Sequence, residues 1–295
     1  MAHGVILKQS AKIAQRLVSL AVKKVLMGTK RLIAETDIAT FQEKGAAVLR
    51  GHFSGWIEPL RRGIESNINQ PSADARIYHN EDGSGLFFGD YCNWNRIPEY
   101  RDFVFKSPVG EIAAALMGSE TARLFHEHVL VKEPGTEVPT PWHHDQPYYC
   151  VNGSMNCSIW LALDPVPREI CVEFVAGSHR LGKWFRPERF NKTPLYEDDP
   201  SEPLPDINAD RDAYEILSWE LEPGDAIAFH FLTLHGAPPN QSKTRRRAFS
   251  SRWIGDDATF ATRKGPTSPP FRDVQLKHGD PMDAAEFPLV FKETD

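Results

Sequence analysis

Residues 142–146 read Trp-His-His-Asp-Gln and concentrate two imidazoles and a carboxylate in three positions. Alternate residues of a β-strand point to the same side, so a strand here would direct His143 and Asp145 to one face and His144 to the other. One imidazole and one carboxylate on the same face can supply two ligands to a divalent metal. A second imidazole would complete a set of two histidines and one carboxylate, the ligand set of non-haem Fe(II) oxygenases.

The third ligand is expected on a neighbouring strand, far along the chain. Residues 224–236 read as a turn, an apolar run and a histidine before a glycine, which places His235 at the end of a predicted strand. His230 competes for this role, but it lies in the middle of the apolar run, where a packed histidine is the simpler interpretation. We therefore predict His143, Asp145 and His235 as the metal ligands.

A basic cluster follows the distal histidine. Residues 245–247 are three arginines, and a predicted strand at 248–253 comes directly after them. A dicarboxylate that binds a metal through one end needs a cation at its other end, and the fork of an arginine binds a carboxylate through two hydrogen bonds. Strand alternation places Arg246 on one face and Arg245 and Arg247 on the other. A solvated strand edge is the alternative interpretation for two of the three.

These features also fit other classes of protein. The chain has eleven histidines, so a lone His-x-Asp pair can arise by chance or as a surface pair. Zinc takes the same ligand types, which keeps a zinc-dependent hydrolase on a β scaffold as one alternative. A non-catalytic metal-binding jelly-roll protein is another. The arginine cluster favours the oxygenase over both, because neither alternative needs a clamp for a buried dicarboxylate.

The elements that must position these residues change character near residue 120. Before Glu35 there are seven Lys or Arg and no acid, and apolar residues recur at helical spacing over 5–33. This predicts a basic N-terminal helix packed on the body, with organelle targeting or membrane-surface binding as the alternatives. The first 120 residues read as mainly helical, with helices predicted at 37–43, 53–67 and 102–117 and a short β-like run at 45–50.

From Thr121 onward the apolar runs are short and bounded by Gly, Pro and Asn. They predict strands at 122–130, 155–163, 171–175, 226–232 and 248–254. Several short strands with turn signals between them indicate a β-sandwich or barrel. Two polar stretches, 181–212 and 262–283, interrupt the pattern, and we expect them to be loops that close over the site.

The composition excludes several classes of protein. Hydrophobic residues make up 41% of the 295 residues and charged residues 25%. No window approaches the roughly 18 consecutive apolar residues that indicate a membrane-spanning helix. Residues 35–295 carry 27 basic and 40 acidic side chains, which argues against general nucleic-acid binding. Four cysteines without a Cys-x-x-Cys pair predict neither a disulfide scaffold nor a structural zinc site, and a cytoplasmic location is the default expectation.

Taken together, these stretches resemble the phytanoyl-CoA dioxygenase family of Fe(II)/2-oxoglutarate oxygenases, which includes ectoine hydroxylase. The resemblance extends from about Ile38 to Asp257 and is carried by residues 124–135, 142–149, 158–165, 175–180 and 224–253. It implies a double-stranded β-helix, a distorted cupin-like jelly roll that is mainly β with flanking N-terminal helices. It also implies that His143, Asp145 and His235 bind Fe(II), with 2-oxoglutarate and O₂ as co-substrates.

The family pattern assigns further residues around the co-substrate. An arginine eleven residues after the distal histidine pairs with 2-oxoglutarate, and this step selects Arg246. By the same resemblance, His126 and Lys132 lie on a strand face beside the co-substrate, Tyr149 is an aromatic residue near it, and Trp160 is an inward-facing aromatic residue. Lys132, Arg252 and Arg263 could also meet an anionic group of the substrate, although surface positions are the simpler interpretation for each of them.

The chain departs from the family pattern at one turn. Residues 167–170 replace an Asn-Gly turn that is common in the family, and Ala176 stands where proline is common, so the geometry of that turn is expected to differ. Asp145 is retained, whereas related halogenases replace this carboxylate by a small residue. The resemblance therefore implies hydroxylation.

The resulting expectation is a basic helix at 1–34 and a single oxygenase domain at 35–295. This domain would consist of a helical part at 35–120, a jelly-roll core at 121–257 and a C-terminal segment at 258–295. Its implied activity is hydroxylation of an unactivated C–H bond in a small molecule, with release of succinate and CO₂. Neither a nucleic-acid partner nor a transmembrane segment is expected, and the residues indicate neither the substrate nor the oligomeric state.

Overall fold

The computed structural model describes residues 32–188, 193–196 and 198–294. The chain divides after Ala34 into two units, and the description below concerns the unit from Glu35 onward. Most of the basic helix predicted over residues 5–33 falls on residues 1–31, which lie outside the described residues, and residues 32 and 33 form a bend. No helix in the described ranges is long and apolar enough to cross a membrane.

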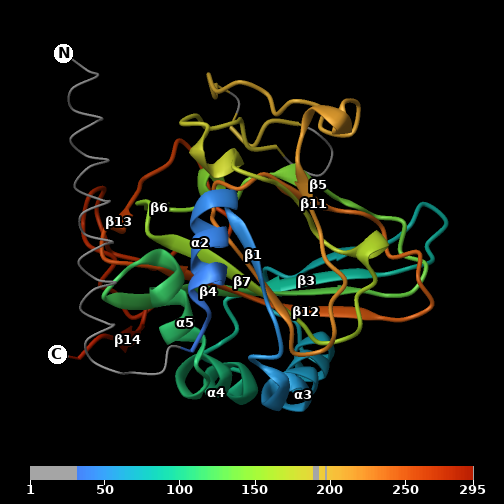
Figure 1. Ribbon diagram of the computed structural model, residues 1–295, viewed down its shortest axis with the longest axis horizontal. Coiled ribbons are helices and arrows are strands. Elements are labelled where there is room, and N and C mark those ends of the chain that lie inside the picture. The colour runs from blue at the N-terminus through green and yellow to red at the C-terminus, as the bar shows by residue number, and fades with distance from the viewer. Residues whose placement is uncertain (1–31, 189–192, 197, 295) are drawn as a thin grey trace. The chain divides into compact units, whose positions relative to one another are not determined.

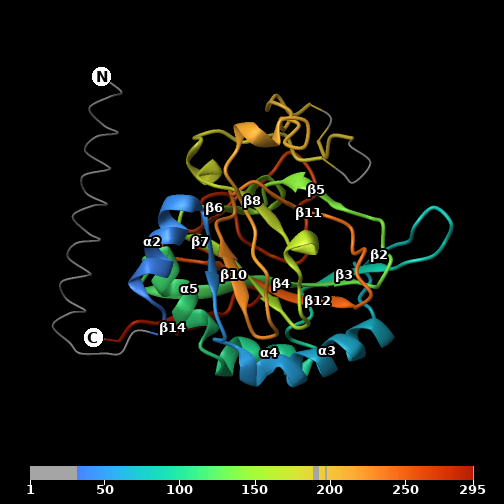
Figure 2. The ribbon, with the colours of Figure 1, turned by 45° about the vertical axis from the view of Figure 1, so that its right-hand side comes forward.

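Two antiparallel sheets face each other (Figures 1 and 2). The eight-stranded major sheet has the order β1 (Ala46–Leu49), β10 (Ala226–Phe229), β7 (Asn156–Ala162), β12 (Arg246–Ile254), β4 (Thr121–Lys132), β3 (Phe87–Tyr91) and β2 (Arg76–Tyr78), with β14 (Leu289–Lys292) also paired to β4. The four-stranded minor sheet has the order β5 (Thr140–His143), β11 (His235–Ala237), β8 (Glu173–Val175) and β9 (Ile216–Leu217). A third pair joins β13 (Thr259–Phe260) to β6 (Val151–Asn152). The predicted mainly β jelly roll with flanking helices is confirmed.

The helices in the described residues are α2 (Glu35–Lys44), α3 (Ile57–Asn69), α4 (Pro98–Lys106) and α5 (Val109–Met117). Helices α3 and α4 lie on the outer face of the major sheet (Figure 2). Tyr100 and Phe103 of α4 pack on Phe249 of β12, with ring centroids 4.9 and 5.2 Å apart respectively. Since alternate residues of a strand face opposite sides, the neighbours of Phe249 on β12 face the space between the two sheets.

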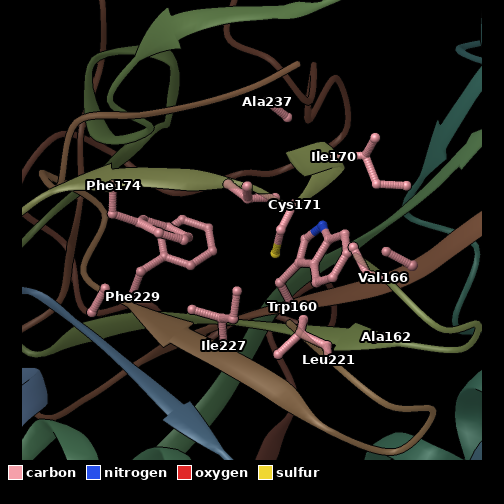
Figure 3. Close-up of a cluster of buried hydrophobic side chains, with 13 residues drawn as sticks. Trp160, Ala162, Val166, Ile170, Cys171, Phe174, Leu221, Ile227, Phe229 and Ala237 are labelled. Atoms are coloured by element: carbon pink, nitrogen blue, oxygen red, sulfur yellow. The ribbon is translucent and has the colours of Figure 1, made fainter. Parts of the chain in front are cut away.

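Apolar side chains fill much of the space between the sheets. Trp160, Ile227 and Phe229 from the major sheet pack against Phe174 and Ala237 from the minor sheet, and all five are buried (Figure 3). This packing holds the minor sheet at a fixed position over the major sheet. It therefore fixes the strand ends that carry His143 and His235.

Three elements differ from the sequence-based expectation. The helix predicted at 102–117 is two helices, because Pro108 forces Ser107 into an extended conformation (ψ 167°) and interrupts the helical hydrogen bonds. Residues 73–95, which read as turn-rich, contain β2 and β3, and β3 is fully buried. The C-terminal segment contributes β14, which pairs with β4 at the far end from the arginine cluster.

The two predicted loops contain little regular structure. Between the 3₁₀ turns at Ser178–Arg180 and Arg211–Ala213, the described residues form only isolated bridges, such as Phe185 with Glu202. This segment lies over the minor sheet in both views (yellow to gold in Figures 1 and 2). The chain over residues 262–283 likewise has no helix or named strand in its described part.

Candidate metal centre

The three predicted ligands converge where β5 and β11 meet. His143 ends β5 and His235 begins β11, and the two residues are register partners in this antiparallel pair. Each of His143, Asp145 and His235 offers one ligand atom, and these atoms lie within 4.8 Å of one another. Asp145 Oδ1 is 3.5 Å from His143 Nε2 and 3.8 Å from His235 Nε2. Two imidazole nitrogens and a carboxylate oxygen therefore point at one location.

The route by which Asp145 reaches this location differs from the expectation. The strand ends at His143, and Asp145 has helical backbone angles (φ −74°, ψ −40°) at the start of a 3₁₀ turn, Gln146–Tyr148. The backbone N–H of Asp145 donates to Phe231 O at 2.7 Å, which ties this turn to the segment before His235. The prediction of a continuous strand was wrong, but the predicted grouping of the two side chains is reproduced by the turn.

Backbone carbonyls orient both imidazoles. His143 Nδ1 lies 2.8 Å from Pro141 O, and His235 Nδ1 lies 2.9 Å from Thr233 O. A carbonyl can only accept, so both Nδ1 atoms carry the proton and both Nε2 atoms keep a free lone pair. Metal-binding histidines are commonly oriented in this way. Burial, together with the nearby His143, lowers the pKa of His235 to about 3, so this ring stays neutral and able to coordinate.

The second oxygen of Asp145 is held from the opposite side. Arg252 Nε lies 3.8 Å from Asp145 Oδ2 and donates to Tyr149 Oη at 2.8 Å, while Ser158 Oγ lies 3.4 Å from Oδ2. Burial alone would raise the pKa of Asp145, but the hydrogen bond from His143 and the nearby His235 and Arg252 hold it well below the usual range. Asp145 is therefore an ionised carboxylate with one oxygen directed at the two imidazoles.

The donor set and the partial burial fit a divalent metal. Asp145 and His235 are almost completely buried, whereas the His143 side chain keeps 26% of its surface exposed, so the site opens at one side. Two nitrogens and one oxygen suit Fe(II) and also Zn(II), and the ligand types do not choose between them.

A second polar group lies on the inner face of the major sheet. Lys132 on β4 and Arg246 on β12 are register partners, and both are buried. Lys132 Nζ donates to Pro238 O at 3.2 Å and lies over the Phe87 ring, while Arg246 donates to Ile170 O. Within the described ranges neither cation is paired with a carboxylate.

Burying two unpaired cations side by side is unfavourable. Burial, with a smaller contribution from Arg246, lowers the pKa of Lys132 to about 6, and burial lowers the pKa of Arg246 to about 10. An anion with two oxygens would relieve this cost. Lys132 and Arg246 therefore form a candidate site for binding a carboxylate between the two sheets.

The other two arginines of the cluster have structural partners. Arg245 pairs with Glu65 and Glu133 at 2.7 and 2.6 Å, and Arg247 pairs with Asp164 at 2.8 Å. These ion pairs lie on the outer face of the sheet and join β12 to α3 and to neighbouring loops. The prediction that Arg246 and its two neighbours lie on opposite faces of the strand is confirmed.

The remaining predicted residues lie at different places. Trp160 faces inward and packs beside Ile170 and Cys171 in the core (Figure 3). Tyr149 lies on the Asp145 side, where it contacts Arg252, and the His126 ring lies 5.3 Å from the Tyr149 ring. Nothing in these contacts links Tyr149 or His126 directly to Arg246.

Two further histidines, the competing His230 and also His179, make contacts away from the metal centre. His230 follows the end of β10, and its Nε2 lies 3.1 Å from Ser154 O while its Nδ1 accepts the Leu232 N–H. His179 Nε2 lies 3.2 Å from Gln42 O. Neither ring reaches the triad, and for His230 this agrees with the prediction from the sequence.

Sequence reasoning underestimated Arg252. A surface position was the simpler interpretation, yet this side chain is 5% exposed and lies beside Asp145. The signal was present in the sequence, because Arg252 lies an even number of residues after Arg246 and therefore shares its strand face.

Comparison with known proteins identifies the family. The family model described as phytanoyl-CoA dioxygenase matches residues 41–248, which is more than half of the chain. A probable phytanoyl-CoA dioxygenase from Caenorhabditis elegans is 25% identical over 156 residues, covering 50% of this chain and 48% of the relative. A methylphosphonate hydroxylase from Gimesia maris is 30% identical over 152 residues, covering 50% of each chain. The chain thus matches about half the length of these curated relatives.

Solved structures share the fold at low sequence identity. The non-haem α-ketoglutarate-dependent carbocyclase SnoK from nogalamycin biosynthesis has a TM-score of 0.68 at 24% identity, covering 89% of this chain and 99% of its own. EctD from S. alaskensis, solved with 2-oxoglutarate and 5-hydroxyectoine, has a TM-score of 0.65 at 17% identity, covering 86% of each chain. The family match spans β1 to the start of β12 and includes all three residues of the triad, and the chain accordingly belongs to the phytanoyl-CoA dioxygenase family.

Proposed function

We propose that the protein is an Fe(II)- and 2-oxoglutarate-dependent dioxygenase that hydroxylates an unactivated C–H bond of a small molecule. The proposal depends on one observation. The triad of two histidines and one carboxylate and the buried pair of unpaired cations both face the space between the two sheets. Metal-binding proteins in general need only the triad. The cation pair adds a place for the far carboxylate of a dicarboxylate.

Two groups of residues would bind the metal and the co-substrate. His143, Asp145 and His235 would hold the metal, and Lys132 and Arg246 would hold the far carboxylate of 2-oxoglutarate. When bound, Fe(II) and 2-oxoglutarate supply the power to oxidise a C–H bond with O₂, releasing succinate and CO₂. The protein supplies the ligand geometry and the positions of the reactants.

Further residues support these two groups in the proposal. Tyr149 and its partner Arg252 would keep Asp145 directed at the metal, because they lie beside its second oxygen. Trp160 would form an apolar wall of the co-substrate site, and His126 would line the polar end of the same lumen. We propose residues 35–295 as one catalytic domain, since strands from its predicted helical part and C-terminal segment complete the major sheet.

Two loop segments dock on residues next to the ligands. The backbone N–H of Phe185 donates to His144 Nε2 at 3.0 Å, and Tyr148 Oη donates to Glu188 O and accepts the Glu188 N–H. Ser268 N–H donates to Tyr148 O at 2.9 Å, which brings the second loop to the same turn. We propose that both loops form the cover of the site.

The two alternatives predict different behaviour. A zinc-dependent hydrolase would use the triad and leave the cations on β4 and β12 without a role. A non-catalytic jelly-roll protein would need neither the cations nor the cover. Since unpaired buried cations are costly, their presence favours the oxygenase.

The substrate is proposed only as a small molecule. The relatives' names refer to phytanoyl-CoA and to methylphosphonate, so they do not agree on one compound. We propose a cytoplasmic enzyme, as the default for a chain with four unpaired cysteines. We also propose that it has no nucleic-acid partner, because residues 35–295 are acidic overall.

The test is an anaerobic titration of metal-free protein with Fe(II) and then 2-oxoglutarate, followed by visible absorption. We expect a weak charge-transfer band that needs both components and is lost in Asp145→Ala. Arg245→Gln, which changes a paired arginine on the outer face, is the matched control and should keep the band. Tight zinc binding without any such band would reject the oxygenase and favour the hydrolase or the binding protein.

A further inference from the structure

Four inward-facing residues form a polar wall beside the metal centre. Ser250 and Arg252 on β12 are register partners of His128 and His126 on β4, respectively. On the other side, Ser250 is also the register partner of Trp160, whose side chain lies in the core between the sheets. The side chains of this polar wall therefore face the same lumen as the triad and the Lys132–Arg246 pair.

Two atoms of the polar wall lack hydrogen-bond partners. His126 Nε2 and Ser250 Oγ are completely buried, and neither is satisfied within the part of the chain that the structure describes. His126 Nδ1 lies 3.2 Å from Glu127 O, so it carries the ring proton and leaves Nε2 as an acceptor. Nearly all buried polar groups in proteins find a partner. Ser250 Oγ can therefore donate to an oxygen of a ligand, whereas His126 Nε2 can only accept and would need a donor group of the ligand.

His128 indicates that a ligand can reach this polar wall. Its side chain is partly exposed although it lies on the inner face of the major sheet. Gly89, on the adjacent strand, makes room for the ring, because a Cβ there would lie 3.1 Å from His128 Nε2. Desolvation by the surrounding protein, followed by the charge of Arg252, lowers the pKa of His128 to about 3, so the ring is a neutral hydrogen-bonding group.

The hydrogen bonds of Arg252 within the protein do not use all of its N–H groups. Its Nε donates to Tyr149 Oη and its Nη1 donates to Ser250 O at 3.0 Å. A guanidinium has five N–H groups, and these two hydrogen bonds leave others for a ligand. The contact with Asp145 is 3.8 Å long, so it is an electrostatic contact and not a hydrogen bond.

The charges inside the barrel do not balance without a further anion. On the inner faces of β3, β4, β7 and β12, the described residues include the cations Lys132, Arg246 and Arg252 but no carboxylate, because Asp90 and Glu127 lie on the outer face. Asp145 and a 2-oxoglutarate dianion together exceed the charge of Fe(II) by a single negative charge. Three protonated cations therefore leave a positive excess, which is costly at low dielectric.

We infer that the substrate carries an oxyanion group, a carboxylate, phosphate or phosphonate, which binds Arg252 and Ser250 on this polar wall beside the metal centre. The inference rests on the proposed function and narrows its substrate to small organic acids. A neutral substrate would leave Arg252 without a full counter-charge. The charge-assisted hydrogen bonds from an arginine to such a group are among the strong ones in proteins.

The test is calorimetric and needs no turnover. Anaerobic protein saturated with Fe(II) and 2-oxoglutarate is titrated with acetate, inorganic phosphate and methylphosphonate, and with acetamide as a neutral match for acetate. The visible band is recorded at every point, so a failure of the proposed function (no band) is distinct from a failure of this inference (a band but no anion binding). We expect saturable binding of at least one oxyanion, no binding of acetamide and an intact band.

Two variants locate the site. Ser250→Ala removes one hydroxyl and should weaken the preferred anion about fivefold, the effect of roughly one hydrogen bond. Arg252→Gln should weaken it at least about tenfold, while Arg252→Lys should retain part of the affinity. Arg245→Gln should change nothing, because this arginine is paired on the outer face. If Arg252→Gln also loses the visible band, because Arg252 contacts Asp145, the location of the anion is judged from Ser250→Ala alone.

Three results would overturn the inference. The first is an intact band with no oxyanion bound at millimolar concentration. The second is anion binding that displaces 2-oxoglutarate and removes the band, which would place the anion at Lys132 and Arg246. The third is equal affinity in wild type, Ser250→Ala and Arg252→Gln.

Discussion

His143 and His235 are register partners across β5 and β11, and their ring centroids lie 4.2 Å apart. Two segments separated by more than ninety residues thus bring their imidazoles together through one antiparallel pair of backbones. The carboxylate of Asp145 reaches the same location through a turn that is tied by hydrogen bonds to Phe231. Each ligand therefore has its own backbone support, and loss of one should not displace the other two.

The first prediction concerns metal binding. Asp145→Ala or His235→Ala removes one of three ligands, and we expect the affinity for Fe(II) to fall at least about a hundredfold, with the fold retained. Metal affinity by anaerobic titration and circular dichroism would measure the two effects. His230→Ala is the matched control, since that ring bonds only to backbone groups, and loss of iron in this variant alone would show that the distal ligand is wrongly assigned.

The second prediction concerns the co-substrate. Arg246→Ala should raise the 2-oxoglutarate concentration needed for half-maximal band intensity about tenfold to a hundredfold, the range for a charged hydrogen bond. Fe(II) binding should be unchanged, because Arg246 contacts none of the three ligands. Arg247→Ala tests specificity, as its guanidinium pairs with Asp164 on the outer face. Equal effects of the two substitutions would contradict the assignment.

The third prediction concerns the protonation state of Lys132. Burial lowers the pKa of Lys132 to about 6 from an ordinary value of 10.5, so between these values the free folded protein lacks a proton that the unfolded chain holds. Folding stability should therefore rise with pH across this window on account of Lys132. A bound carboxylate favours the charged ammonium, so 2-oxoglutarate should be bound with uptake of a proton near pH 7.5.

Calorimetry in buffers of different ionisation enthalpy measures this uptake. We expect up to one proton for the wild type and close to none for Lys132→Met. Identical proton uptake in the two proteins would remove Lys132 from the co-substrate site.

Much of the site could be read from the sequence, because strand alternation and turn residues are local signals. Opposite strand faces were predicted for Arg246 and for its neighbours Arg245 and Arg247 without any knowledge of their partners. His235 was chosen as a histidine before a glycine turn at the end of a strand, but it is the first residue of β11, and Gly236 lies within that strand. These arguments need only the period of a strand.

Other features depend on tertiary contacts that no local pattern contains. The backbone turn that carries Asp145 depends on hydrogen bonds from its N–H and that of Gln146 to Phe231, almost ninety residues away. β3 was missed because aromatic residues interrupted by glycine resemble a loop, whereas pairing with β4 makes it a buried strand. The burial of Arg252 beside Asp145 depends on how the two sheets pack against each other, which sequence spacing alone does not specify.

The fourth prediction concerns the cover of the site. His144 accepts the Phe185 N–H inside the protein, and burial lowers the pKa of this histidine to about 4, so it remains an acceptor at neutral pH. His144→Ala should leave that N–H without its partner and accelerate its hydrogen exchange about fivefold. Mass spectrometry of peptides spanning Phe185 measures the effect. His230→Ala serves again as the control, and unchanged exchange in His144→Ala would show that another contact holds the segment.

The fifth prediction concerns stability away from the site. Glu127 lies on the outer face of β4 and is completely buried, with one oxygen accepting the Asn93 N–H and the other without a partner in the described residues. Burial raises its pKa to about 8 from 4.5, so between these values the folded protein holds a proton that the unfolded chain has lost. Its contribution to stability is full below pH 4.5 and is lost as the pH rises through 8.

Glu127→Gln keeps the shape and removes the titration, so the variant should gain stability relative to the wild type as the pH rises from 5 to 9. The gain expected at pH 9 is roughly 2 to 4 kcal/mol. Urea unfolding of metal-free protein across this range measures it, and Glu111→Gln, at an exposed helix position, should show little change. A difference between wild type and Glu127→Gln that stays constant with pH would mean that Glu127 is ionised in the folded protein, held by a charge or a water molecule that compensates its burial.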